Sequence, residues 1–354
     1  MIQSSDAKAR KIASFNPDAV GDTNANIFGL PFTPLEADVV IIPVPWDVTV
    51  SNLDGTASGP HNVLEQSPQI DLFDEAVIDP WKAGIAMEEI PAEIAALNQR
   101  LRKQATDYIS ILEENPGKEI SQESKDMLNS INQACEELME NIRKKASDYL
   151  AQGKLVVLLG GDHSTPLGLI NALADSHDEF GILQIDAHAD LRDAYMGFTH
   201  SHASIMYNAS KIKQVKSIVQ AGLRDISATE AGLIMSNPEK FHAFFARELH
   251  ARGFEGEPWK AVCQDIISRL PEKVYVSFDI DGLDPAQCPT TGTPVPGGLD
   301  YSKVLYLFEQ LAASGRTIIG FDLVETGPGQ TDGIIACRIL YKTIALMLKS
   351  NQKI

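Results

Sequence analysis

Apolar and polar positions along the chain form two patterns: short continuous apolar runs, and longer stretches with helical periodicity. From Lys154 onward the two patterns alternate, which is the signature of a parallel sheet with crossover helices. The apolar runs predict strands at Leu155–Leu159, Gly181–Ile185, Ser217–Ala221, Val274–Phe278 and Thr317–Leu323. The helical patterns predict helices at Pro166–Ala174, Pro238–Ala251, Pro258–Leu270, Tyr301–Ala313 and Gly333–Leu348. We therefore expect an α/β fold with a mainly parallel central sheet.

The first part of the chain has a different texture. Residues 1–36 are polar, with scattered Asn, Asp and Pro, and are expected to form an extended N-terminal arm. Ala37–Val44 is the first continuous apolar run and predicts a strand buried on both faces. Between residues 91 and 151, apolar positions recur at helical spacing on both sides of an Asn115-Pro-Gly117 break. This predicts a helical hairpin, used for packing or oligomer contact, inserted into a single domain that spans residues 37–354.

Composition narrows the class of protein. The chain has 354 residues, of which 44% are hydrophobic, so it can bury a sizeable core. Its net charge of −18 argues against nucleic acid or an anionic membrane as partner and suits a small cationic substrate. The four cysteines are scattered without a CxxC pair, as in a reducing compartment. No apolar run approaches the roughly 20 residues of a membrane span, and the N-terminus has no signal-peptide core, so a cytoplasmic protein is expected.

Candidate metal ligands follow one predicted strand directly. Asp186, His188 and Asp190 come just after Gly181–Ile185, and in an extended chain positions i, i+2 and i+4 project to the same side. Carboxylate oxygens and imidazole nitrogens together suit a divalent metal such as Mn, Fe, Ni or Zn. Aspartate is also common in solvated turns after strands, so this spacing alone leaves both interpretations open.

Further candidate ligands follow other predicted strands. His163 comes after Leu155–Leu159, Asp279 and Asp281 come after Val274–Phe278, and Glu325 comes after Thr317–Leu323. In open α/β sheets, sites form outside the carboxyl ends of the strands. Two divalent cations about 3.5–4 Å apart need several ligands each, with some carboxylates shared. Taken together, the candidate ligands at these strand ends predict a site for two cations. They are His163, Asp186, His188, Asp190, Asp279 and Asp281.

Three motifs resemble the metal signatures of the ureohydrolase family, which includes arginases, agmatinases, guanidinobutyrases, formimidoylglutamases and guanidine hydrolases. The motifs are Gly160-Gly-Asp-His-Ser164, Asp186-Ala-His-Ala-Asp190 and Ser277-Phe-Asp-Ile-Asp281. The resemblance runs from about Ala37 to Leu348, and within the family the chain is most similar to agmatinase-type members. It implies a three-layer α/β/α fold, two divalent metal ions (usually Mn, in some members Ni), and a homo-oligomer, a trimer or hexamer.

The resemblance also implies a role for each residue. His163 and Asp190 would bind one metal, His188 and Asp281 the other, and Asp186 and Asp279 would bridge them. Two divalent cations lower the pKa of water, so hydroxide becomes available near neutral pH to attack the central carbon of a guanidinium. Asp190 would orient this hydroxide, and Glu325 would bind the guanidinium by a charge-assisted contact. His202 would carry a proton to the departing amine; His200 is the second candidate, but His202-Ala-Ser-Ile fits the family frame better.

The sequence is less decisive about the substrate. Arg192 stands where arginases usually carry an asparagine; such an arginine can meet a substrate carboxylate, as in formimidoylglutamases, or simply pair with Asp193 or Asp225. Asp193-Ala-Tyr-Met-Gly197 looks more like agmatinase-type members, so hydrolysis of agmatine to putrescine and urea is the leading hypothesis. Guanidine or a guanidino acid comes next, followed by formimidoylglutamate and arginine. Two other classes stay open: a single-zinc deacetylase-like enzyme, and a metal-binding scaffold without activity.

Overall fold

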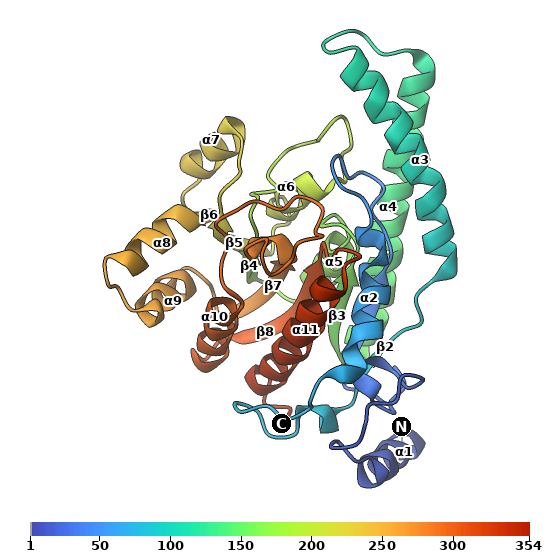
Figure 1. Cartoon of the computed structure of the whole chain (residues 1–354), viewed down its shortest axis with the longest axis vertical. Coiled ribbons are helices and arrows are strands. Elements are labelled where there is room, and N and C mark those ends of the chain that lie inside the picture. The colour runs from blue at the N-terminus through green and yellow to red at the C-terminus, as the bar shows by residue number, and fades with distance from the viewer. Residues whose placement is uncertain (1) are drawn as a thin grey trace.

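The computed structural model describes residues 2–354, in which eight strands form one parallel sheet (Figure 1). The strands are β1 (Val39–Val44), β2 (Ile85–Met87), β3 (Leu155–Gly160), β4 (Phe180–Ile185), β5 (Val215–Leu223), β6 (Phe241–Phe245), β7 (Lys273–Asp279) and β8 (Thr317–Val324). Their order across the sheet is β2-β1-β3-β8-β7-β4-β5-β6. The neighbours β3, β8, β7 and β4 thus occupy the centre of the sheet, where both faces are covered.

Helices cover both faces of the sheet (Figure 1). They are α1 (Ile2–Ser14), α2 (Gly59–Gln66), α3 (Ala92–Glu114), α4 (Gln122–Ala151), α5 (Leu167–Ser176), α6 (Ile205–Ser210), α7 (Ala228–Ser236), α8 (Ala246–Phe254), α9 (Trp259–Ser268), α10 (Tyr301–Ala313) and α11 (Gln330–Ser350). Side chains of α3 to α7 pack into one apolar cluster, and those of α2 and α8 to α11 into another. Strand residues alternate between the clusters: Val157 and Leu159 join one, Val156 and Leu158 the other. The predicted three-layer α/β/α fold is confirmed.

The register of the central strands brings the candidate ligands to one edge of the sheet. Ile185 of β4 pairs with Phe278 of β7, so Asp186 and Asp279 leave the sheet side by side. Asp279 in turn pairs with Val324 of β8, one residue before Glu325. Because all the strands are parallel, each of these side chains emerges at the carboxyl end of its strand.

The six strands expected from apolar runs are present, whereas two short strands and several short helices had no predicted counterpart. The helix predicted at Pro238–Ala251 is wrong in its first half, since β6 occupies Phe241–Phe245 and α8 begins only at Ala246. This segment forms a strand because its main chain pairs with β5. The helical spacing of its apolar residues is a local pattern and does not reveal that a neighbouring strand is available for pairing. The N-terminal segment begins with helix α1 and is not extended throughout.

The predicted helical hairpin consists of α3 and α4, which are joined across the Asn115–Gly117 break and extend beyond the rest of the molecule (Figure 1). The Ser121 hydroxyl accepts a bond from the Ser124 N–H and so caps the start of α4. The buried face of α4 lies on α5, and a Cβ atom at Gly168 would stand 2.5 Å from the Met139 carbonyl oxygen. This spacing shows how closely the hairpin packs on the central fold. Across residues 2–354, no helix has the length and apolar character needed to cross a membrane.

Candidate metal centre

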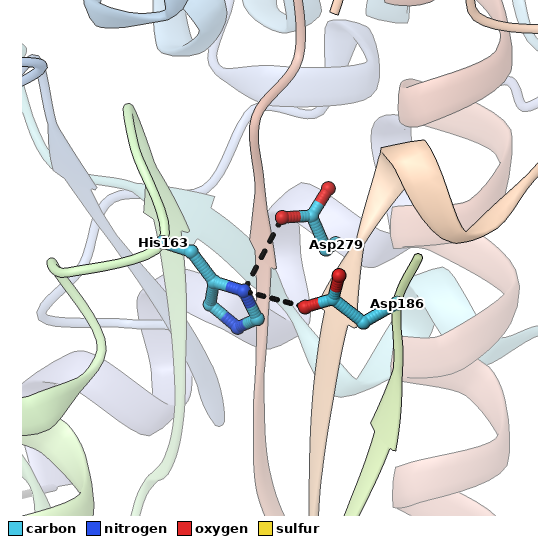
Figure 2. Close-up of side chains that lie close together, drawn as sticks. All are labelled: His163, Asp186 and Asp279. Atoms are coloured by element: carbon cyan, nitrogen blue, oxygen red, sulfur yellow. Dashed lines mark ion pairs between the residues drawn. The ribbon is translucent and has the colours of Figure 1, made fainter. Parts of the chain in front are cut away.

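His163, Asp186 and Asp279 point toward one another from the ends of β3, β4 and β7 (Figure 2). The His163 Nδ1 atom lies 2.9 Å from Asp186 Oδ2 and 3.2 Å from Asp279 Oδ2. Asp190 joins the same group, with its Oδ2 atom 3.0 Å from His163 Nδ1. All four side chains are buried, so three carboxylates converge on one imidazole nitrogen away from solvent.

A second group adjoins the first and shares Asp186 with it. His188 Nδ1 lies 3.1 Å from Asp281 Oδ2 and 3.5 Å from Asp186 Oδ1. The two oxygens of Asp186 therefore face different histidines, as a carboxylate bridging two cations requires. Asp279 differs, because its Oδ2 atom faces His163, whereas its Oδ1 atom accepts the Asp281 N–H at 2.8 Å and is paired with no histidine in the described residues. The structure thus brings together all six residues expected to bind metal, while a bridging role for Asp279 stays a prediction.

Polar side chains from two strands and one loop orient these candidate ligands. His163 Nε2 lies 2.9 Å from the Ser277 hydroxyl of β7, and Gln184 of β4 donates to Asp186 Oδ2 at 2.7 Å. The Thr293 hydroxyl donates to Asp281 Oδ2 at 3.1 Å. Such partners fix the tautomer and orientation of metal-binding side chains. The sequence reasoning missed them, although a glutamine and a serine interrupting two buried apolar strands at paired positions were a usable signal.

The chemistry of this set suits divalent cations. Within residues 2–354, His163 Nδ1 has no hydrogen-bond partner, although three carboxylate oxygens surround it. With Nε2 carrying the proton toward Ser277, the Nδ1 lone pair would face carboxylate lone pairs, an arrangement that a cation relieves. Burial and the neighbouring Asp186 charge raise the pKa of Asp190 to about 7, so a positive charge here would restore its ionised form. The residues present therefore fit two metal ions.

Asp190 and Glu325 both adopt left-handed backbone conformations that are rare for residues other than glycine. Their φ angles are 54° and 59°. Such residues cost on the order of 1–3 kcal/mol and are retained where the surrounding structure holds them. At Glu325 the restraints are a bond from its own N–H to the Gly161 carbonyl and one from the Thr291 hydroxyl to its carbonyl. The unusual backbone aims both carboxylates toward the metal groups.

Glu325 lies beside the first metal group, where its Oε1 atom accepts the His163 N–H at 2.9 Å. A Cβ atom added at Gly292 would stand 3.2 Å from Glu325 Oε2, so a glycine leaves room next to this oxygen. Burial and the charge of Asp162 raise the pKa of Glu325 well above its usual value. A guanidinium bound here would restore the ionised carboxylate. The binding role of Glu325 remains a prediction.

The two candidate proton carriers lie in different places. His202 lines a cavity of about 340 Å³ together with His188, Asp190 and Thr293, whereas His200 faces a separate groove along α4 beside Glu136. Burial, followed by the charges of His188 and His163, lowers the pKa of His202 to about 3, so its imidazole is neutral at neutral pH. Of the two histidines, only His202 borders the cavity that holds candidate metal ligands.

Arg192 borders the same cavity, but acidic and aromatic side chains already contact its cation. Its Nε atom lies 3.9 Å from Glu230 Oε2, and its guanidinium carbon lies 4.9 Å from the centre of the Tyr195 ring. The sequence suggests Asp193 or Asp225 as a partner of Arg192, whereas the structure places Glu230 beside it. This buried glutamate was missed; the signal was Ser227 three residues before it, which forms a capping box with it at the start of α7.

The fold and the donor set define an α/β/α protein with a candidate centre for two divalent cations. The same fold occurs in the agmatine ureohydrolase of Thermoplasma volcanium, with a TM-score of 0.68 and 21% identity over 98% of this chain and 99% of that one. It also occurs in the proclavaminate amidino hydrolase from Streptomyces clavuligerus, with a TM-score of 0.71 and 21% identity over 94% and 100%.

Sequence comparison identifies the family. The model of the arginase family matches residues 37–345. N(1)-aminopropylagmatine ureohydrolase of Thermus thermophilus is 31% identical over 323 residues, which cover 90% of this chain and 94% of that protein. The chain belongs to the arginase family, whose ureohydrolases cleave C–N bonds of guanidino compounds at a binuclear divalent metal site. The family predicted from the three motifs, and with it an enzyme acting on linear amidines, is confirmed.

Proposed function

We propose that this protein is a binuclear metal-dependent ureohydrolase that releases urea from a small guanidinoalkyl amine, with agmatine as the leading substrate. The observation that carries this proposal is the pair of ligand groups sharing Asp186, each with its own histidine and at least one further carboxylate. A single-zinc hydrolase would have no use for the second complete group. An inactive scaffold would be expected to lack a ligand, and all six are in place.

The mechanism follows from the positions of the side chains. His163 and Asp190 would hold one ion, His188 and Asp281 the other, with Asp186 and Asp279 between them. Two bound cations supply hydroxide near neutral pH by lowering the pKa of water. Asp190 then accepts a hydrogen bond from the nucleophile and aims it at the guanidinium carbon, while Glu325 neutralises and orients the guanidinium. The imidazole of His202 would accept the proton released when water becomes hydroxide and deliver it to the amine nitrogen as the C–N bond breaks.

The cavity favours an amine-bearing substrate over a guanidino acid. Beside His188 and His202, its lining includes Asp225 and Glu230 as well as Asp190, while Arg192 is its one arginine. Glu230 and Tyr195 lie next to the Arg192 cation and offset its positive charge, so acidic side chains outnumber arginine and lysine in this cavity. The name of the Thermus thermophilus relative, an N(1)-aminopropylagmatine ureohydrolase, supports the same choice.

The metal, the assembly and the location are further parts of the proposal. Oxygen-rich ligand groups with one imidazole each suit Mn²⁺, with Ni²⁺ as the alternative. We propose that the protein assembles as a trimer or hexamer. We also propose that it acts in the cytoplasm, since the four cysteines are unpaired and buried, as in a reducing compartment.

The decisive experiment loads the protein separately with Mn²⁺ and Ni²⁺, determines the metal content, and measures product release from a panel of amidines. The panel contains agmatine, N(1)-aminopropylagmatine, guanidine, 4-guanidinobutyrate and arginine, scored by urea, and formimidoylglutamate, scored by formamide. We expect close to two metal ions per chain and the highest kcat/KM with an amine-bearing substrate. One zinc per chain with amide cleavage, or no turnover with either metal, would refute the proposal.

A further inference from the structure

Two loops, one from each side, form walls of the active-site cavity. Ser51 belongs to the loop after β1, and the segment from Arg192 to Ala203 belongs to the loop after β4. In the described residues, neither loop contains an α-helix or a strand of the sheet, and each has one short helical turn, at Thr56–Ser58 and at His202–Ser204. Side chains from the α3–α4 hairpin contact both loops, and these contacts indicate a role for the hairpin beyond packing.

The loop after β1 is held by two side chains of α3, one buried and one partly buried. Asp47 and Asn98 bond reciprocally: the Asp47 N–H donates to Asn98 Oδ1 at 2.8 Å, and Asn98 Nδ2 donates to Asp47 Oδ1 at 2.9 Å. One turn further along α3, Arg102 Nη1 donates to the carbonyl oxygens of Val48 at 3.1 Å and Val50 at 2.7 Å. A charged donor that serves two backbone carbonyls fixes the path of the loop just before Ser51.

The loop after β4 contains a tight turn from Tyr195 to Phe198. Tyr195 and Phe198 exchange both backbone hydrogen bonds, and the two residues between them, Met196 and Gly197, have φ angles of 53° and 87°. Positive φ at both central positions is the signature of a type I′ turn, which normally favours asparagine, aspartate or glycine. A methionine at the first of these positions is therefore strained and needs support from outside the turn.

Both helices of the hairpin supply that support. The Tyr108 hydroxyl of α3 donates to the Met196 carbonyl at 3.1 Å, and Asn132 of α4 donates to the Gly197 carbonyl at 3.0 Å. Asn132 Oδ1 also accepts the Thr199 N–H at 3.1 Å, so one side chain spans the end of the turn. The contact is close, because a Cβ atom at Gly197 would stand 2.8 Å from Leu128 Cδ2 on α4.

The turn presents Tyr195 to the residues that face the cavity. The Tyr195 ring meets the His202 ring edge-on, with 6.1 Å between the ring centres, and Arg192 lies over the Tyr195 ring. No hydrogen bond of the Tyr195 hydroxyl is found in the described part of the chain, so its contacts with both neighbours are made by the ring. A displaced turn would therefore move His202 and Arg192 together.

We propose that the α3–α4 hairpin positions the two walls of the active site, with Asn132 and Arg102 as its anchors and Tyr195 as the positioning residue for His202. In the described residues, no hydrogen bond or ion pair joins the hairpin to the candidate metal ligands, so the hairpin acts through the loops. The effect on catalysis through His202 rests on the proposed function, in which this histidine carries a proton. The anchoring of the two loops by the hairpin does not depend on that function.

The first test compares Asn132→Ala with Asn129→Ala, an exposed asparagine on the same helix. We measure amide hydrogen exchange, metal content, and kcat and KM with the best substrate of the panel. Asn132→Ala is expected to speed exchange in residues 192–204, to leave the metal content unchanged, and to lower kcat by about ten- to one hundredfold, as small misplacements of catalytic groups do. Asn129→Ala is expected to match the wild type. Unchanged exchange in Asn132→Ala, or faster exchange with unchanged kcat, would overturn the proposal.

Tyr195 separates positioning from direct chemistry. Tyr195→Phe keeps the ring and is expected to retain most of kcat, whereas Tyr195→Ala should lose as much as Asn132→Ala without releasing metal. Equal loss in both variants would assign the function to the hydroxyl and contradict a positioning role for the ring.

The opposite wall has its own matched pair on α3. Arg102→Met should speed exchange in residues 46–58, while Arg100→Met, at an exposed position two residues earlier, should not. Equal exchange in the two variants would remove Arg102 from the proposal. Exchange and metal content are measured without substrate, so an inactive wild type would refute the proposed function and leave the anchoring of both loops to be decided by exchange alone.

Discussion

At the scale of single residues, the candidate centre depends on how closely the loops approach one another. Gly161 lies between the loop after β1 and the end of β8: its N–H donates to the Val44 carbonyl, and its carbonyl accepts the Glu325 N–H at 2.7 Å. A Cβ atom at this position would stand 2.0 Å from the Trp46 carbonyl oxygen. Gly161, the second glycine of the first motif, stands two residues before His163, and only a residue without a side chain fits there.

We predict that Gly161→Ala lowers the free energy of unfolding by about 2–3 kcal/mol, as overpacking of a tight interior does. Because the strain falls on the loop that carries His163 and on the backbone of Glu325, the variant should also bind less metal. Gly232→Ala is the control, since a Cβ atom there meets nothing within 4 Å and the residue lies inside α7. It should be neutral or stabilising by up to about 1 kcal/mol. Denaturant unfolding checks both; wild-type stability in Gly161→Ala would contradict the packing argument.

At the scale of elements, the sequence predicts best what local periodicity encodes. The long buried strands and the helices α9, α10 and α11 were recognised because their apolar pattern is fixed by burial alone. The apolar spacing around β6 predicts a helix, because the identity of this strand depends on pairing with β5, and the short β2 gives too few residues for a pattern. The six candidate metal ligands could be predicted because each stands at or after the end of a strand, whereas Ser277 and Gln184 lie within strands, where only the register reveals what they face.

Helix α1 provides a prediction about pH, because an ion pair attaches it to the segment before β1. Lys11 Nζ lies 2.6 Å from Glu36 Oε2, and the Thr33 N–H and hydroxyl donate to the same oxygen. Burial opposes ionisation of Glu36, but the bonds from Lys11 and Thr33 outweigh it and lower the pKa of this carboxyl. A lowered folded-state pKa means that the contribution to stability is present above the unfolded value and is lost as pH falls through the folded value.

Glu36→Gln should therefore destabilise the protein by about 1 kcal/mol at pH 7. The difference from the wild type should shrink as pH falls below about 4.3, where a glutamate in the unfolded chain takes up its proton. Unfolding transitions recorded across this pH range measure the effect, with the exposed Glu113→Gln on α3 as control. A difference that does not vary with pH would assign the loss to packing and not to charge.

At the scale of the whole molecule, the candidate centre connects segments that are far apart in the sequence. His163 follows β3, Asp186 and His188 follow β4, Asp279 ends β7 and Asp281 follows it, so the candidate ligands come from the middle of the sheet. Burying these carboxylates together opposes folding unless cations balance their charge. Metal binding is then linked to the stability of the whole fold, since a site assembled from three strands does not exist in the unfolded chain.

We predict that removing the metals with a chelator lowers the melting temperature, and that Mn²⁺ restores it in a concentration-dependent way. A ligand that binds only the folded state, present at one hundred times its dissociation constant, stabilises that state by about 2.7 kcal/mol.

Asp281→Ala should lose one metal ion and most of the activity, yet still gain part of the Mn²⁺-dependent stabilisation, because His163, Asp186, Asp190 and Asp279 remain. His163→Ala should lose the other ion, and the double variant should show little response to Mn²⁺. If Asp281→Ala kept two ions and full activity, its assignment as a ligand would be wrong; an equal melting temperature with and without metal would break the link between the site and the fold.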